Sequence, residues 1–186
     1  MTSIAVTRFD KYTWEENLNW RKAHNWDGCV YQCTRLIKDG IPLRTGLYVL
    51  EMNNTTNKIM GIGYIKNYPN LENNPRIYSN QCYNFYLYKG KYHINVDEIT
   101  DEDEKKIINI INKLIFTGKG HFKRGLGIQE LPMTIKEVYV KEIKTYIENN
   151  KEVSENIYDT RIQDISDLLI FFKHIFCRKY DNLDIF

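Results

Sequence analysis

The feature that most limits the fold of this chain is a series of short strand-like runs between residues 28 and 94. The runs are rich in β-branched and aromatic residues, which suit a pleated surface. The connections between them are too short to hold the crossover helix that parallel neighbours need. The sequence therefore predicts a mainly antiparallel sheet, built from residues 29–37, 47–52, 58–66, 76–78, 83–88 and 91–94.

Two of these runs are joined by the polar residues 53–57, which predict a hairpin loop. Strict alternation in the second run places Ile59, Gly61, Gly63 and Ile65 on one face. Glycines on a strand face mark a bulge, a sharp bend, or the close approach of another group. We therefore expect this sheet to be strongly curved, with residues 89–90 as a further two-residue turn.

Helical patterns dominate the second half of the chain. Residues 100–116 predict one helix, because Thr100 can cap it, four acids follow, and isoleucines repeat along one face. After Pro132, apolar residues recur every three or four positions, as on one face of a helix. This spacing occurs both before and after the polar residues 148–160. The expected fold class is α+β, with a curved, mostly antiparallel sheet or small barrel, a covering helix and C-terminal helices.

The length of 186 residues fits one domain with attached segments. Residues 1–27 predict an N-terminal arm that holds all three tryptophans, with Thr13 as the cap of a short helix. Residues 28–132 predict the barrel-like α+β domain. Residues 133–186 predict a helical extension packed on it.

Charge and cysteine content limit the classes of function. The formal net charge is only +2, so any nucleic-acid footprint must be a local patch. Four sparse cysteines, with no signal peptide and no long apolar run, predict an intracellular protein without a membrane partner. Cys29 and Cys33 are expected to be reduced. No metal site or cofactor is predicted, because the other candidate ligands are scattered singly.

The residues from Thr117 to Ile128 are the main functional signal. Four glycines there let the backbone turn tightly, and no acid occurs between Gly118 and Glu130. Such a cationic loop with accessible N–H groups suits an anionic ligand, most often phosphate. The alternative is a helix C-cap followed by a basic surface turn. The residues predicted to contact phosphate are Gly118, Lys119, Gly120, His121, Lys123 and Arg124.

Two resemblances add to this interpretation. Residues 49–63, 76–78, 88–92 and 116–125 resemble a group of uncharacterised proteins of nucleocytoplasmic large DNA viruses. This resemblance implies other viral proteins as partners and a location in the host cytoplasm, at viral factories, or in the nucleus. The strand, hairpin loop and strand that end in residues 59–65 are similar to the barrel entry of PUA-like domains, which include EVE, ASCH and YTH modules. That similarity implies binding of RNA or modified bases through an aromatic pocket beside a basic rim.

The leading hypothesis is a nucleic-acid-binding module that recognises RNA or a modified or extruded base. Trp20, Trp26 and Tyr86 are the candidates for stacking on the base, and Asn53 and Asn54 for hydrogen bonds to its edge. One alternative is a nuclease or phosphoryl-transfer enzyme that uses His121 with Glu51. Another is a viral structural or protein-interaction component that uses the late helices and the tyrosines.

Overall fold

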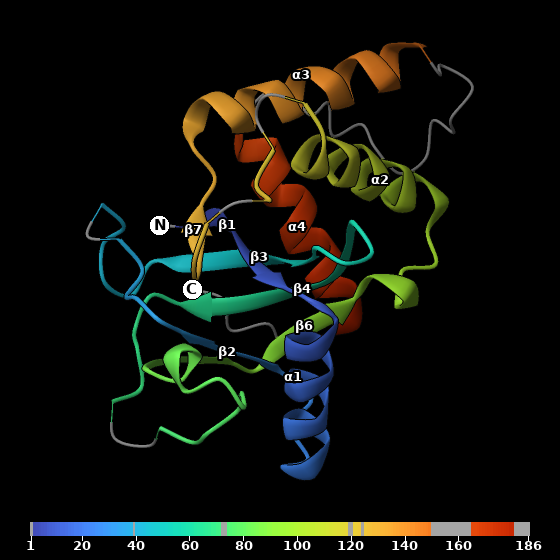
Figure 1. Cartoon of the computed structure of the whole chain (residues 1–186). Coiled ribbons are helices and arrows are strands. Elements are labelled where there is room, and N and C mark those ends of the chain that lie inside the picture. The colour runs from blue at the N-terminus through green and yellow to red at the C-terminus, as the bar shows by residue number, and fades with distance from the viewer. Residues whose placement is uncertain are drawn as a thin grey trace.

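The computed structural model describes residues 2–38, 40–71, 74–118, 121–123, 125–149 and 165–180. These residues form an α+β fold, as predicted (Figure 1). The helices are α1 (Lys11–Ala23), α2 (Glu102–Phe116), α3 (Met133–Asn149) and α4 (Ile165–Lys179), with short 3-10 helices η1 (Gln81–Tyr83) and η2 (Val96–Glu98). The strands are β1 (Thr2–Phe9), β2 (Cys29–Cys33), β3 (Gly46–Asn53), β4 (Lys58–Lys66), β5 (Tyr86–Gly90), β6 (Tyr92–Asn95) and β7 (Gln129–Glu130).

The strands form two sheets. The main sheet has the order β6-β4-β3-β1-β7, and a separate ribbon pairs β2 with β5. Every pair is antiparallel except β1 with β3, so the expected mostly antiparallel sheet is confirmed. The predicted hairpin between β3 and β4 is also confirmed. The strands that the structure describes do not close into a barrel.

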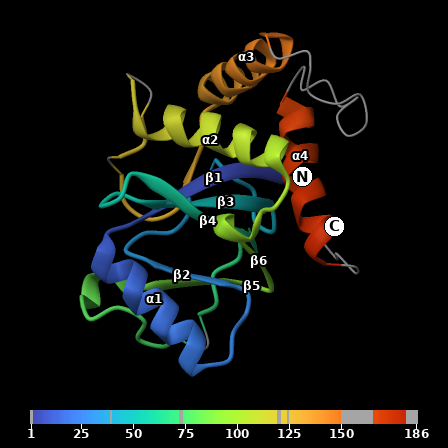
Figure 2. The same ribbon diagram turned by 90° about the vertical axis from the view of Figure 1, so that its right-hand side faces the viewer.

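Both faces of the main sheet are covered. Figure 2 shows α2 and α3 on one side, α1 with β2 and β5 on the other, and α4 running alongside. Every residue of β3 is buried as a result. One core joins the sheet to α2, α3 and α4, and a second core joins its other face to the ribbon. The predicted covering helix and packed C-terminal helices are therefore confirmed, although Asp101 and not Thr100 caps α2. None of the helices in the described residues combines the length and apolar character needed to cross a membrane.

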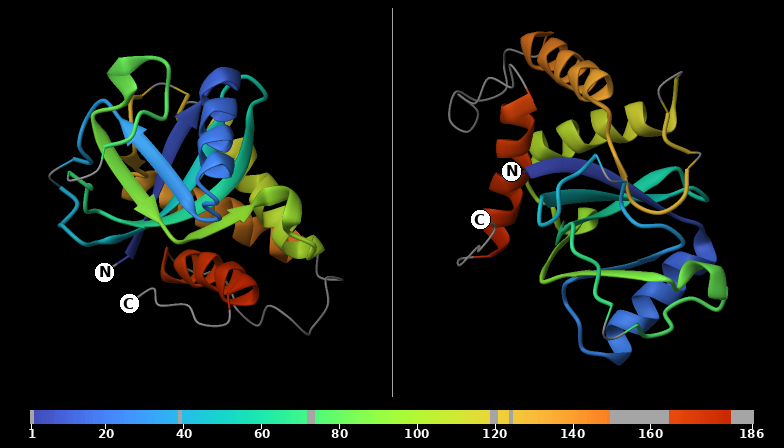
Figure 3. Two further views of the ribbon diagram at one scale, coloured as in Figure 1. Left: turned by 90° about the horizontal axis from the view of Figure 1, so that it is seen from below. Right: turned by 90° about the vertical axis from the view of Figure 1, so that its left-hand side faces the viewer.

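The N-terminal segment corrects the prediction of a separate arm. Residues 2–9 form an inner strand, β1, which lies between β3 and β7 (Figure 3). A strand buried on both faces has no alternation of polar and apolar residues, so the pattern that marks a strand is missing. The helix that follows begins at Lys11, because Asp10 accepts a hydrogen bond from Thr13 N. Thr13, predicted as the cap, is the third helical residue and completes a capping box.

Three details of the predicted sheet are also wrong. Residues 76–78 are not in a strand, and β2 ends at Cys33. Lys89 and Gly90 do not form a hairpin turn, because β5 pairs with β2 whereas β6 pairs with β4. The chain passes from the ribbon into the main sheet at Gly90, where an added Cβ would lie 1.9 Å from the carbonyl oxygen of Tyr64. Glycine is required there by this close contact between two backbones.

Candidate functional site: a pocket between the two sheets

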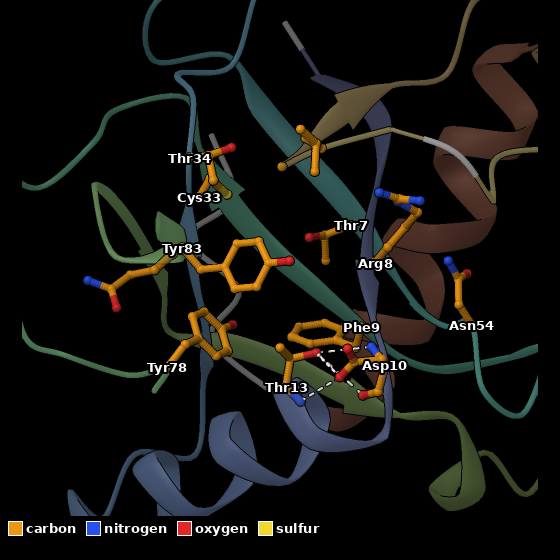
Figure 4. Close-up of a pocket in the computed structure, with 13 residues that line it drawn as sticks. Thr7, Arg8, Phe9, Asp10, Thr13, Cys33, Thr34, Asn54, Tyr78 and Tyr83 are labelled. Atoms are coloured by element: carbon orange, nitrogen blue, oxygen red, sulfur yellow. Dashed lines mark hydrogen bonds between the residues drawn. The ribbon is translucent and has the colours of Figure 1, made fainter. Parts of the chain in front are cut away.

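A pocket of about 160 Å³ lies between the ends of β1 and β2 (Figure 4). We call it the seam pocket, because it occupies the gap where the two sheets are not hydrogen-bonded to each other. Strand β7 pairs only with Ala5 and Val6, and β2 pairs only with β5. The later residues of β1 are therefore free to face the end of β2 across the gap. The pocket is lined by Thr7, Arg8, Phe9, Asp10, Thr13, Gln32, Cys33, Thr34, Asn54, Tyr78, Tyr83, Leu126 and Gly127.

Three aromatic rings line the seam pocket. Tyr78 and Tyr83 meet edge to face with ring centroids 6.1 Å apart, and Phe9 packs in the same manner on Trp14 at 5.2 Å. The Tyr78 hydroxyl is buried and accepts a hydrogen bond from Asn17 Nδ2 at 3.1 Å. The Tyr83 hydroxyl points into the open space toward Thr7 (Figure 4). Packing thus holds Phe9 and Tyr78 in place, while Tyr83 can meet a ligand.

Two buried polar atoms beside these rings have no hydrogen-bond partner among the residues that the structure describes. They are Thr34 Oγ1 and Asn54 Oδ1. Asn54 is held at its other end, since its Nδ2 donates to the carbonyl oxygen of Lys123 at 3.1 Å. Arg8 donates to the same carbonyl oxygen through Nη1. Buried polar groups in folded proteins nearly always have partners. The free oxygens of Thr34 and Asn54 are therefore available to hydrogen-bond donors of a ligand.

The size of the seam pocket sets a limit on what enters it. A cavity of about 150 Å³ is sufficient for a benzene ring. The 160 Å³ of this pocket therefore suits one six-membered ring. Asp10 and Thr13 are committed to capping α1, as the dashed lines in Figure 4 show. Gln32 is also engaged, because its amide donates to Asn74 and Pro75 and accepts from Ile77 N. The polar groups left to contact such a ring are those of Thr7, Arg8, Thr34, Asn54 and Tyr83.

The glycine-rich loop forms part of this site. Its carbonyl oxygen at Lys123 is bound by Arg8 and Asn54, and Leu126 and Gly127 line the pocket. Gly118 directly follows the C-cap residue of α2 and has φ +77°. This is the conformation expected under the alternative interpretation, in which the glycine ends the helix. His121, which belongs to the same loop, is exposed. Lys119, Gly120 and Arg124, also predicted to contact phosphate, lie outside the described residues.

Of the residues predicted to bind a base, only Asn54 lines the pocket. Asn53 is buried and its Oδ1 accepts from Thr55 N and Thr56 N, so it shapes the β3–β4 turn. Tyr86 packs against the second core. Trp20 and Trp26 surround Lys89 Nζ, which lies 5.5 and 3.6 Å from their ring centroids. Neither tryptophan is among the residues that line the seam pocket, so the structure does not bring these aromatics together with Asn54 there.

The sequence analysis missed the aromatic and basic side chains that do line the pocket. Phe9 and Arg8 were assigned to the N-terminal arm and were not predicted as site residues. Tyr78 and Tyr83 were assigned to strands, but Tyr83 ends η1 and Tyr78 precedes it in a loop. One signal was available: Arg8 is a charged residue at the end of the apolar run Ile4–Val6. Nothing local linked it to residues 78 and 83.

The predicted pairing of Glu51 with His121 is also corrected. Glu51 is only 1% exposed, and it accepts hydrogen bonds from the Tyr31 hydroxyl at 2.7 Å and from His93 Nε2 at 2.9 Å. His93 Nδ1 lies 3.1 Å from Arg21 Nη2, which makes Nδ1 the acceptor. Burial alone would raise the pKa of Glu51, but His93, Tyr31 and Arg21 together hold this pKa below its ordinary value. We call these four residues the carboxylate network.

The glycines of β4 make room for this network. A Cβ at Gly61 would lie 2.3 Å from Glu51 Oε2, and a Cβ at Gly63 would lie 1.9 Å from the Tyr31 hydroxyl. The close approach predicted for these glycines is thus confirmed. A bulge in β4 opposite Glu51 and Met52 also reverses the predicted face of Ile59, which packs in the core of the helices.

The two cysteines of β2 are buried free thiols, and burial raises the pKa of both Cys29 and Cys33 to about 12. Thiols with so high a pKa are poor nucleophiles and poor metal ligands at neutral pH. Within the described ranges, no three His, Cys, Asp or Glu side chains are grouped in a way that could hold a metal ion.

The resemblances to viral proteins and to PUA-like domains stay predictions. A scan against protein-family models and searches of curated proteins and of solved structures found no match to this chain.

Proposed function

We propose that the protein binds single-stranded RNA, or a modified or extruded base, by taking one base into the seam pocket. The observation that carries this proposal is the pair of buried, unpartnered oxygens of Thr34 and Asn54 beside aromatic rings. Recognition of an unstacked base needs both elements, an aromatic face for stacking and polar groups for the base edge. The pocket also has the size of one ring.

The rim of the pocket would supply positive charge for the phosphate group of the bound nucleotide. Arg8 and Asn54 hold the backbone of the glycine-rich loop at Lys123, beside the pocket. The cations of this loop would meet the backbone of the strand whose base is bound. An aromatic pocket beside a basic rim is also the arrangement that the resemblance to PUA-like domains implies.

The two alternatives have less support. Glu51 is buried and bound by Tyr31 and His93, so an enzyme that uses Glu51 with His121 is not proposed. The apolar stripes of α3 and α4 were the main argument for a protein-interaction component. Their largest members, such as Tyr139, Phe172 and Phe176, are buried in the core.

The proposal is tested by measuring the affinity of single-stranded RNA and DNA pools for the protein and for Tyr83→Ala. Stacking of one base on an aromatic ring is worth about 1–3 kcal/mol, so Tyr83→Ala should weaken binding roughly 5- to 150-fold. Tyr83→Phe is the matched control, because it keeps the ring and should retain most of the affinity. Unchanged binding by Tyr83→Ala would contradict the proposal, and so would cleavage of the pool without stable binding.

A further inference from the structure

A second hollow lies where β4 ends and β5 passes into β6. It is an open groove of about 640 Å³, which we call the basic groove. Its lining includes four cations and two exposed or half-buried tyrosines: Arg44, Lys66, Lys89, Lys91, Tyr68 and Tyr92. None of the described residues that line it is an Asp or a Glu. In a chain with a net charge of only +2, four cations without an acid are a local concentration of positive charge.

The four cations are exposed, and no acid among the described residues pairs with them. All four side chains are exposed, and none takes part in the ion pairs found among the described residues. Their backbones, in contrast, are fixed. Lys66 is the last residue of β4, Lys91 separates β5 from β6, and Arg44 N donates to the carbonyl oxygen of Asn67 at 3.0 Å. The sheet thus presents the charges from a rigid base.

Aromatic faces accompany these charges. Tyr68 is 63% exposed, and Tyr92 packs edge to face on Tyr180 with centroids 5.0 Å apart. Lys89, which lines the groove, lies over the rings of Trp20 and Trp26. Interleaved cations and aromatic rings are typical of surfaces that follow a single-stranded nucleic acid. The two tryptophans predicted to stack on a base therefore adjoin this groove through Lys89.

The basic groove and the seam pocket lie at opposite ends of the main sheet. The register pairs Thr2 with Gly46 and Gly46 with Lys66 at the groove end, and Phe9 with Asn53 at the pocket end. At about 3.3 Å per residue, the length of β1 separates the two ends by roughly 23 Å. One bound nucleotide cannot reach both, whereas a longer strand can.

We propose that the basic groove binds the phosphate backbone of a single-stranded nucleic acid, as a second contact for the strand whose base enters the seam pocket. The identity of the ligand rests on the proposed function, but the groove residues are separate from the pocket. A strand of about 4 nucleotides should occupy one site, and a strand of about 16 should reach both, within the range of site sizes known for single-strand binders.

The test uses the double variant Lys66→Glu/Lys91→Glu of the full chain, with RNAs of about 4 and about 16 nucleotides. The control is Lys141→Glu/Lys144→Glu on the exposed face of α3, which changes the net charge equally. Each lost phosphate contact should reduce the log-log salt slope by about 0.7, so the groove variant should lose about 1.4 units with the long RNA. Its affinity for the long RNA should fall at least tenfold at low salt, and the control should keep the slope. Lys66→Gln/Lys91→Gln repeats the test if charge reversal prevents folding.

The outcomes separate the two proposals. If Tyr83→Ala loses binding and the groove variant binds fully, the groove proposal is wrong and the pocket proposal stands. If the groove variant loses binding and Tyr83→Ala binds fully, the pocket proposal is wrong and the groove proposal stands. An equal loss in the groove and α3 variants would overturn the groove, because total charge would then explain both. Tighter binding to anionic phospholipid vesicles than to RNA, lost in the groove variant, would overturn nucleic acid as its ligand.

Discussion

The carboxylate network and the seam pocket are two polar clusters under the same sheet, and they differ in how their hydrogen bonds are completed. Around Glu51, each polar group meets a partner from another element: Tyr31 from β2, His93 from β6 and Arg21 from α1. In the seam pocket, the oxygens of Thr34 and Asn54 find no partner in the described part of the chain. A network in which every polar group has a partner holds neighbouring elements together. A buried polar group without a partner lowers the stability of the fold, and such groups are found where a ligand supplies the missing partner.

The strongest test of this difference is Glu51→Ala. The variant leaves the Tyr31 hydroxyl and His93 Nε2 without their shared acceptor, in a buried site. A buried polar group left without its partner costs about 1–3 kcal/mol, and two such groups remain, so the free energy of unfolding should fall by about 2–6 kcal/mol. Urea denaturation followed by circular dichroism measures it. A loss below about 1 kcal/mol would show that the network does not hold the layers together.

The pH dependence of stability should report the same carboxylate. The pKa of Glu51 in the fold is below its ordinary value of 4.5, so its contribution is complete above pH 4.5. As the pH falls from 4.5 through the folded-state pKa, protonation favours the unfolded state and the free energy of unfolding falls. One such group contributes at most about 1.4 kcal/mol per pH unit. Glu51→Gln should show a shallower decline than the unchanged chain in acid titrations, and parallel curves would contradict this assignment.

A change of opposite sign is expected in the seam pocket. Thr34→Val keeps the shape of the side chain and removes a buried oxygen that has no partner. An unsatisfied buried group costs about 1–3 kcal/mol, so the variant should be more stable by up to about 1 kcal/mol, since the residue is only half-buried. Thermal unfolding measures this gain, and RNA binding should weaken in the same variant. Destabilisation with unchanged binding would assign Thr34 a structural role.

The smallest effect on stability is expected from the cations of the glycine-rich loop. The triple change of Lys119, Lys123 and Arg124 to alanine should scarcely alter the melting temperature, because ion pairs of lysine and arginine at protein surfaces contribute only about 0 to 1 kcal/mol in general. It should weaken RNA binding across sequences and reduce the log-log salt slope by about two units. If affinity and slope both stay unaltered, the loop does not contact phosphate.

Local patterns predicted the parts of this fold that depend on local contacts. The β3–β4 hairpin was evident from its polar turn, and α2 from its isoleucine stripe, because each pattern reports one element and its nearest neighbour. Strand β1 was missed because it pairs with β3 in parallel and with β7 near residue 130, so its partners are remote in sequence. Its burial on both faces removed the alternation that marks a strand.

The site was less predictable for the same reason. Asn54 was found because its turn is locally polar, and Gly61 and Gly63 because glycine in a strand interior is unusual. The seam pocket, in contrast, brings together residues near 8, 33, 54, 83 and 127, and only the tertiary fold juxtaposes them. The basic groove was not predicted because Arg44 and Lys66 are remote in sequence from Lys89 and Lys91, and only the fold brings them together.

The position of β1 also has a consequence for how the chain reaches its fold. Ala5 pairs with Glu130, so the edge of the main sheet cannot be completed until most of the chain has left the ribosome. Until then, the apolar residues Ile4, Ala5 and Val6 have only part of their final cover. Contacts between such distant segments slow folding, because a long loop must close before they form. During synthesis this strand is therefore exposed to chaperones and to mispairing with other strands until residue 130 is available.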